Sequence, residues 1–133
     1  MDFEDSPELA AFRAQVRAFL EAHARPRSGD DRDWSHEWQA LLYDSGWAGI
    51  TWPTAFGGRG GTPAQQIVFN QELARFDATS GFLNAAIALV GPTLMQHGTP
   101  AQQTRYLGPL LRGDESWCQL FSEPGAGSDL ASL

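Results

Sequence analysis

Hydrophobic positions near the start of the chain recur at helical spacing. A polar stretch, Asp5-Ser6-Pro7-Glu8, precedes them, and a second polar stretch over residues 25–31 follows them. The apolar side chains between these breaks lie three or four residues apart, on one face of a helix: Leu9, Phe12, Val16, Phe19 and Leu20. Ser6 is placed to cap this helix and Pro7 suits its first turn. The pattern predicts a first helix that ends before Arg25.

A second apolar stripe follows the polar break. It predicts a helix that begins near Trp34 or Ser35, turns Trp38, Leu41 and Leu42 inward, and is capped by Gly46. From Gly46 to Thr62 the glycines and prolines are too dense for a helix. The large apolar side chains of this loop are predicted to anchor it to the core: Trp47, Ile50, Trp52 and Phe56.

The tetrapeptide Thr-Pro-Ala-Gln occurs twice, at Thr62 and at Thr99, and predicts two further helix starts. In each copy the threonine is placed to cap the helix, while the glutamine side chain reaches back to the cap N–H. The flanking sequences do not match, so we interpret the two copies as capping boxes and not as an internal repeat. The first helix is predicted to run to about Arg75. The second is predicted to run to about Leu107, with Gly108-Pro109 breaking it.

Residues 80–97 form the least polar stretch of the chain. They predict a helix that is buried on nearly every side, with a kink at Gly91-Pro92. Several small side chains leave volume beside this helix: Ala85, Ala86, Ala88 and Gly91. Either tight helix packing or the wall of a ligand pocket would explain them, and the pattern alone favours packing. With the preceding segments, this stretch predicts an all-α fold.

The last residues change character. Residues 115–120 alternate polar and apolar side chains, which predicts a short strand, and a loop rich in glycine and proline follows. Gly125 and Gly127 permit positive φ and leave room for a ligand to approach bare backbone amides, while Pro124 stiffens the loop. Such a loop presents N–H and O–H donors to a planar, carbonyl-rich or phosphate-bearing ligand. The alternative is an ordinary surface turn.

Length, composition and charge narrow the class of protein. A chain of 133 residues with 42% hydrophobic residues, five Trp and eight Phe has room for one domain with a real core. No apolar run approaches the length of a membrane span, and the acidic N-terminus lacks the pattern of a signal peptide. A single cysteine cannot form an internal disulfide, so we expect a cytoplasmic protein. A net charge of −7 disfavours nucleic acid and anionic membranes as partners.

Metal and nucleophile chemistry find little support in the sequence. The three histidines show no metal-ligand spacing with cysteine or carboxylates: His23, His36 and His97. Cys118 has no histidine near it in the sequence, and we interpret it as a packing residue. We therefore predict no metal site.

The final loop carries a resemblance to a known family. Ser122-Glu123-Pro124-x-Ala126-Gly127-Ser128-Asp129 is similar to the first signature of the acyl-CoA dehydrogenases, FAD enzymes that oxidise acyl thioesters. Other stretches agree in order and spacing: Pro53-x-x-Phe56-Gly57-Gly58-x-Gly60-Gly61, Gln71-Glu72-Leu73-Ala74-Arg75, Gly98-Thr99-x-x-Gln102-Gln103-x-x-Tyr106-Leu107 and Leu110-x-x-Gly113-Asp114-Glu115. The resemblance implies an orthogonal helical bundle over residues 1–114. It also implies that residues 115–133 are the first strand and FAD-contacting loop of a middle β-domain.

The resemblance also implies site residues. The residues expected to contact FAD are Gln119, Leu120, Phe121, Ser122, Gly127 and Ser128. Ser122 would donate to the pyrimidine edge of the flavin, and Ser128 would also touch bound acyl-CoA. Ala85 and Leu89 would belong to the wall of the acyl pocket. Gln119 and Phe121 depart from the commonest residues of the family, although main-chain contacts survive a change of side chain.

In this family a glutamate removes the proton α to the thioester carbonyl, and the β hydrogen leaves as hydride to the flavin. That glutamate belongs to a C-terminal helical domain, so we expect no catalytic residue in residues 1–133. Glu72 is assigned to helix pairing and Glu123 to holding the loop. The chain alone is predicted neither to hold FAD tightly nor to dehydrogenate a substrate. The complete enzyme is expected to form a homo-oligomer or heteromer and to reduce an electron-transfer flavoprotein.

Two other functions stay open. The chain could be a non-catalytic helical subunit that completes the site of a flavoprotein partner, which copurification with a larger flavoprotein would favour. It could also belong to a branch with oxidase or monooxygenase-like flavin chemistry, which oxygen reactivity of the reduced protein would reveal. The sequence does not identify the acyl group.

Overall fold

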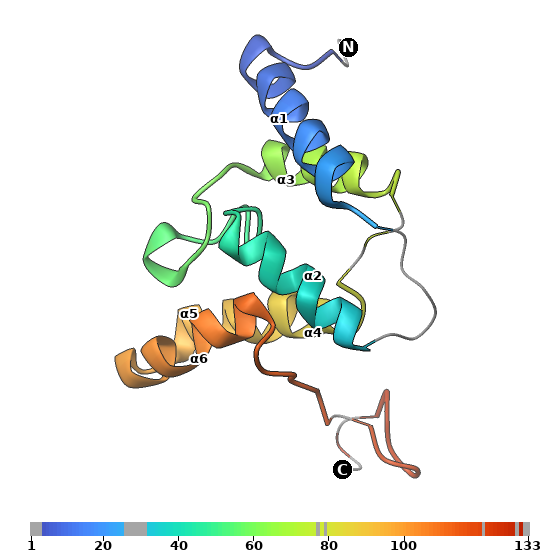
Figure 1. Cartoon of the computed structure of the whole chain (residues 1–133). Helices are drawn as coiled ribbons and strands as arrows, with labels where there is room; N and C mark the ends of the chain where they lie inside the picture. Colours follow the sequence, from blue (N-terminus) through green and yellow to red (C-terminus); the bar gives the residue numbers. More distant parts are fainter. Residues whose placement is uncertain are drawn as a thin grey trace.

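The computed structural model describes residues 4–25, 32–76, 78, 80–120, 122–129 and 131, and is built from helices (Figure 1). Along the chain these are α1 (Pro7–His23), α2 (Arg32–Asp44), the 3₁₀ turn η1 (Thr54–Phe56), α3 (Pro63–Leu73), α4 (Leu83–Ala85), the π-helical η2 (Ala86–Val90), α5 (Gly91–His97) and α6 (Pro100–Arg112). The described residues form no sheet, and their only β pairing is an isolated bridge between Glu123 and Ala126. The all-α prediction is confirmed.

The first two helices follow the sequence signals. The Ser6 hydroxyl accepts a hydrogen bond from the Leu9 N–H at 3.3 Å, and Pro7 opens α1. The helix α2 begins two residues before the predicted start, and Gly46 adopts φ 72° just beyond its end. Most of the predicted polar break lies outside the described residues.

The long loop after α2 is anchored as predicted. Trp47, Ile50 and Trp52 are buried, and Phe56 packs partly buried against the same core. Trp47 stacks on Phe69 of α3, with 6.1 Å between ring centroids. The loop is therefore a fixed part of the core.

Both capping boxes form, at Thr62 and at Thr99. The helix α6, however, continues through Pro109 to Arg112, so the predicted break at Gly108-Pro109 is wrong. A proline inside a helix costs about 3 kcal/mol. Burial of the two leucines beyond the predicted end, Leu110 and Leu111, offsets this cost, at roughly 1.5–3 kcal/mol each. Gly113, at φ 83°, ends the helix.

The apolar stretch over residues 80–97 changes helix type where a kink was predicted. The Gly91 N–H donates to the Ala86 carbonyl, five residues back, and Pro92 then falls in the first turn of α5. The predicted burial on every side is wrong. Leu83, Ala86 and Gly91 are buried, but Phe82 is 38% exposed and Leu89 is 49% exposed. The Phe82 ring meets the His36 ring of α2 edge-on, with 5.4 Å between centroids, whereas Leu89 stays half exposed.

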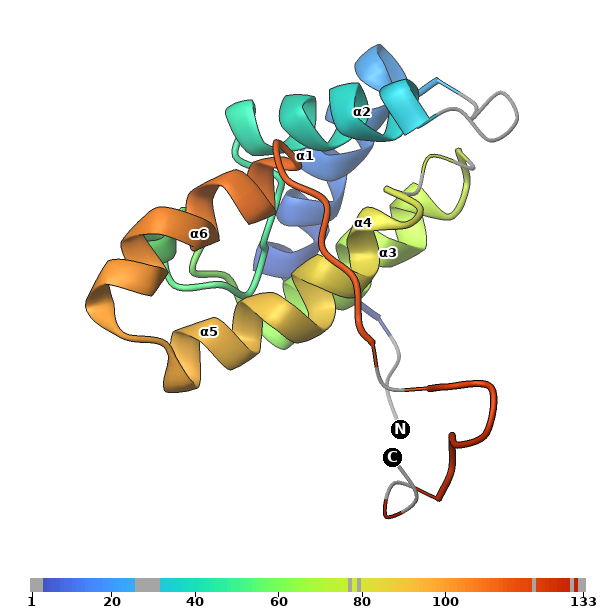
Figure 2. The same cartoon turned by 90° about the horizontal axis from the view of Figure 1, so that it is seen from below.

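The helices pack in pairs that place the tail of the chain. α1 lies against α3, and α6 lies against both α2 and α5 (Figures 1 and 2). Figure 2 shows the tail leaving the end of α6 and running past α4. In both views the loop after residue 120 lies outside the helical body. No helix among the described residues is long and apolar enough to cross a bilayer.

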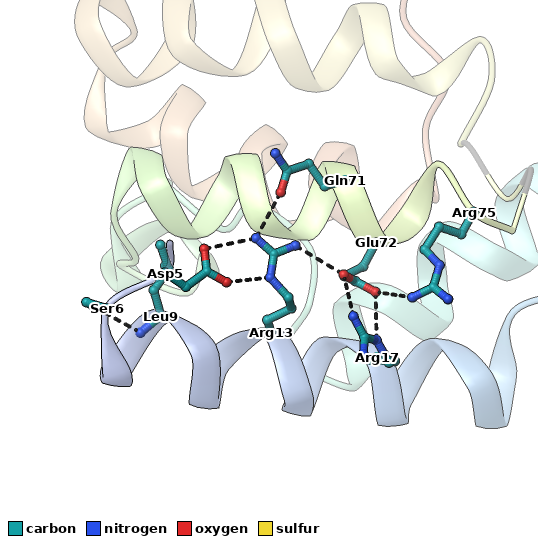
Figure 3. A network of polar contacts seen from close by, with 8 residues as sticks. All are labelled: Asp5, Ser6, Leu9, Arg13, Arg17, Gln71, Glu72 and Arg75. Atoms are coloured by element: carbon teal, nitrogen blue, oxygen red, sulfur yellow. Dashed lines mark hydrogen bonds and ion pairs between the residues drawn. The ribbon is translucent and has the colours of Figure 1, made fainter. Parts of the chain in front are cut away.

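A buried carboxylate joins α1 to α3 (Figure 3). Glu72 accepts hydrogen bonds from Arg17 at 3.0 Å, from Arg13 at 3.1 Å and from Arg75 at 2.9 Å. Arg13 also binds Asp5 before α1 and Gln71 on α3. The predicted role of Glu72 in helix pairing matches this geometry.

Candidate functional site

The tail that follows α6 forms no backbone strand pairing over residues 115–120 among the described residues. Residues 115–120 were predicted to form the first strand of a β-domain, and the structure gives them no strand partner in the part of the chain that it describes, so this strand stays a prediction. A strand requires a neighbour that accepts and donates its backbone hydrogen bonds. The sequence pattern suits a strand, but no described segment supplies that neighbour.

The signature loop is a closed turn. The Glu123 N–H donates to the Ala126 carbonyl at 2.7 Å, and the Ala126 N–H donates back at 3.2 Å, with Pro124-Gly125 between them. The backbone of Glu123 thus holds the loop. Gly125 and Gly127 do not adopt positive φ, contrary to the expected use of these glycines. Their lack of a side chain serves to leave the backbone open.

The predicted cofactor contacts lie together on this exposed tail. Every described member of the set is exposed: Gln119, Leu120, Ser122, Gly127 and Ser128. Phe121, the remaining predicted contact, lies outside the described residues. A Cβ atom added to Gly127 would stand 3.9 Å from the Ser122 hydroxyl oxygen, so these two residues are neighbours. The loop therefore exposes the Ser122 hydroxyl to solvent, next to the backbone of Gly127, which no side chain covers.

A cavity of about 540 Å³ lies between the anchored loop, α3 and η2. Its lining is mainly apolar and includes three aromatic side chains: Trp47, Trp52 and Phe69. Amide side chains supply polar groups: Gln66, Asn70 and Asn84. Ligand pockets for small molecules are of this size and composition. The cavity is thus the second candidate part of the site.

Gln39 and Ser80 form a buried polar pair in the wall of this cavity, and the sequence analysis missed them. The Ser80 hydroxyl donates to the Gln39 side-chain carbonyl at 2.5 Å, and the Gln39 amide donates to the Leu111 carbonyl at 2.6 Å. Both residues are at least 95% buried. This pair ties α2, α6 and the segment before α4 together. A polar residue inside the apolar stripe of α2 was the available signal.

The helical segment beside the cavity turns three residues towards it: Asn84, Ile87 and Ala88. Ala85 and Leu89, the residues predicted to contact substrate, are exposed and do not line the cavity. They lie one position along in the helix, on the adjacent face. The segment predicted to contact substrate therefore lines the cavity, but through side chains next to Ala85 and Leu89 and not through these two residues.

Among the described residues that line the cavity, none carries an ionisable side chain. The buried carboxylate of Glu72 lies in the ion-pair network, where hydrogen bonds from Arg17, Arg13 and Arg75 lower its pKa to about 2. A carboxylate with so low a pKa is a poor base. No cluster of metal-ligating side chains occurs among the described residues.

Comparison with known proteins identifies the family of this chain. Residues 6–114 match the family model described as acyl-CoA dehydrogenase, N-terminal domain. The chain therefore belongs to the acyl-CoA dehydrogenase family. Acyl-CoA dehydrogenase FadE34 of Mycobacterium tuberculosis is 42% identical over 132 residues, which are 96% of this chain and 16% of that protein.

Solved structures share the fold. The Tcur3481-Tcur3483 steroid ACAD matches 100% of this chain and 36% of its own, with a TM-score of 0.79 and 33% identity. The ChsE4-ChsE5 complex from Mycobacterium tuberculosis matches 100% of this chain and 35% of its own, with a TM-score of 0.78 and 29% identity. The chain thus spans about a third or less of the lengths of these proteins.

Proposed function

We propose that this chain is the N-terminal part of an FAD-dependent acyl-CoA dehydrogenase that introduces an α,β double bond into an acyl-CoA thioester. The observation that carries the proposal is the exposed turn of residues 122–129, attached to a helical domain that matches the family over residues 6–114. The turn keeps the family's hydroxyls and glycines in the open. The catalytic glutamate is expected in polypeptide outside these residues.

The exposed turn fits a flavin. Ser122 lies next to Gly127, whose lack of a side chain leaves the backbone open to a flat ring. Bound FAD would supply the hydride acceptor for the reaction. Ser122 and Ser128 hold and orient the ring through their hydroxyls, and main-chain groups of Gln119, Leu120 and Phe121 extend this contact.

The cavity beside η2 is our candidate for the acyl group. It is large and mainly apolar, and none of its described lining residues is charged, as an acyl tail requires. Ala85 and Leu89 remain proposed substrate contacts on the adjacent exposed face, and Ser128 on the loop. The likeness to a steroid ACAD supports a bulky, ring-bearing acyl group over a short linear one.

A substitution inside the cavity tests the acyl assignment. Ala88→Phe in the complete enzyme would fill space beside Ile87, so kcat/KM for a bulky acyl-CoA should fall roughly tenfold or more relative to a short one. Ala101→Phe, an exposed alanine on α6, serves as the matched control and should change neither value. Equal losses for both substrates in Ala88→Phe would contradict the assignment.

The same proposal covers partners and location. We propose an assembly of more than one subunit in the cytoplasm, with an electron-transfer flavoprotein as electron acceptor. The likeness to the ChsE4-ChsE5 complex supports an assembly of unlike subunits. Analytical ultracentrifugation of the complete protein would measure the stoichiometry.

Equilibrium dialysis against FAD tests the cofactor assignment. The 133-residue chain should show no tight, stoichiometric binding, because only one edge of the flavin would be contacted. The chain together with the rest of the enzyme should bind one FAD per site. Tight binding by the 133 residues alone would contradict the proposal that the rest of the enzyme is needed to hold FAD.

A non-catalytic subunit is the second candidate, and the resemblance to a two-protein complex favours it. In that case the exposed face with Phe82 and Leu89 would dock on a larger flavoprotein. Copurification with such a protein, with FAD bound only in the complex, would distinguish this function from that of a single-chain dehydrogenase.

A further inference from the structure

Three consecutive residues at the start of the tail are attached to the helical body. Glu115 forms an ion pair with Arg105 of α6 at 2.7 Å, from Oε1 to Nη1. Ser116 pairs with His36 of α2, with 3.4 Å between the hydroxyl oxygen and Nε2. Trp117 meets the ring of Tyr106 edge-on, with 5.2 Å between centroids and 85° between planes. We call residues 115–117 the tail anchor.

The helix side of the tail anchor is organised as well. The Arg105 guanidinium lies over the Tyr106 ring, 5.0 Å from its centroid, while it holds Glu115. His36 hydrogen-bonds the Gly113 carbonyl through Nδ1, at the end of α6 where the tail begins. Trp117 packs against the hydrophobic core and is partly buried. The attachment thus joins an ion pair, an aromatic pair and a histidine from two helices.

The attachment ends abruptly. Cys118, Gln119 and Leu120 follow directly and are exposed, Leu120 by 89%. No side-chain hydrogen bond or ion pair attaches these three residues to the helices of the described structure. The part of the tail that is attached to the helices therefore ends at Trp117. Gln119, the first residue of the proposed flavin contact, follows two residues later.

We propose that the tail anchor fixes the starting point of the flavin loop, so that Tyr106 and Arg105 act as positioning residues for cofactor binding. A loop that begins from a fixed point has fewer conformations to lose when its ligand binds, so anchoring raises affinity without touching the ligand. The part that concerns FAD rests on the proposed function. The anchoring itself does not.

The tail anchor can be tested on the chain as it is, because Cys118 is its single cysteine and is exposed. A nitroxide attached to Cys118 reports the mobility of the tail by electron paramagnetic resonance. Trp117→Ala and Tyr106→Leu should each sharpen the spectrum towards that of a free chain, and Trp117→Phe should restore most of the order. Glu115→Gln should have a smaller effect, since a surface ion pair is weak by itself.

Asp44→Asn is the matched control. It removes an ion pair of similar length and exposure, Arg112 to Asp44 at 3.0 Å, which joins α6 to α2 without touching residues 115–117. Its spectrum should equal that of the unsubstituted chain. Circular dichroism identifies any variant that has lost its helices. An unchanged spectrum in a folded Trp117→Ala chain would overturn the anchor.

The role towards the cofactor is measured in the complete enzyme. Trp117→Ala should raise the FAD dissociation constant about tenfold, with no such change in Asp44→Asn and an unchanged kcat at saturating FAD. A mobile label combined with an unchanged FAD dissociation constant would overturn the positioning role. Absence of FAD from the unsubstituted enzyme would instead overturn the proposed function and leave the label result intact.

Discussion

At the scale of single residues, the buried carboxylate of Glu72 contributes to stability through its ion pairs. Its side chain is 4% exposed and accepts hydrogen bonds from three arginines. Glu72→Gln should lower the free energy of unfolding by about 2–3 kcal/mol, below the 3–5 kcal/mol of fully buried pairs, because Arg17 and Arg75 can return to water. Urea denaturation measures the loss. Glu37→Gln, on an exposed position of α2, should stay within about 0.5 kcal/mol.

The same residue sets an acid dependence. The pKa of Glu72 falls from 4.5 to about 2 because Arg17, Arg13 and Arg75 stabilise its charge. A lowered pKa contributes stability that is complete above pH 4.5 and is lost as pH falls towards 2. The difference in unfolding free energy between the unsubstituted chain and Glu72→Gln should therefore shrink over this window. A constant difference from pH 6 to pH 2 would contradict the assigned pKa.

The side chains that line the cavity could not be selected correctly from the sequence. The apolar pattern predicted a buried helix, and only the family resemblance implied a pocket wall there; that segment does line the cavity. Ala85 and Leu89 were selected, whereas Asn84, Ile87 and Ala88 face the cavity. The resemblance indicated the segment without fixing which side chains face the cavity, and the π-helical turn from Ala86 to Val90 departs from the 3.6-residue period of a regular helix.

At the scale of elements, the packing of η2 and α5 against the anchored loop depends on Gly91. A Cβ atom there would meet the Trp52 ring at 2.1 Å, and Trp52 is buried. Helix propensity favours Gly91→Ala by about 1 kcal/mol. Overpacking costs typically 1–3 kcal/mol and should win. We expect a net loss of stability in urea denaturation. Gly125→Ala, with no atom within 4 Å, should be neutral; a stabilised Gly91→Ala chain would contradict this packing.

Local signals predicted element starts better than element ends. Ser6, Thr62 and Thr99 are bonded to the backbone three residues ahead, so their capping role is written in a few neighbouring residues. The continuation of α6 through Pro109 depends on burial against distant helices. The strand predicted at residues 115–120 needs a partner that the described chain does not supply. Both features depend on contacts that are remote in sequence.

At the scale of the whole molecule, the helical body and the signature loop supply different parts of the proposed site. The helical body supplies a cavity and an anchored tail, while the proposed flavin contacts remain in solvent. The cavity combines residues from α2, the loop at 46–52, α3 and η2, so the sequence alone could not have located it. The signature loop was recognisable because its residues are consecutive.

Anaerobic addition of an acyl-CoA to the purified complete protein tests the central claim most directly. The visible absorption of bound FAD should bleach as the flavin is reduced, and an enoyl-CoA should appear in equal amount. The Ser122→Ala variant should bind or reduce FAD less well than the unsubstituted protein. A complete protein that contains no flavin, or whose flavin stays oxidised with short, long, branched and ring-bearing acyl-CoA thioesters, would contradict the account.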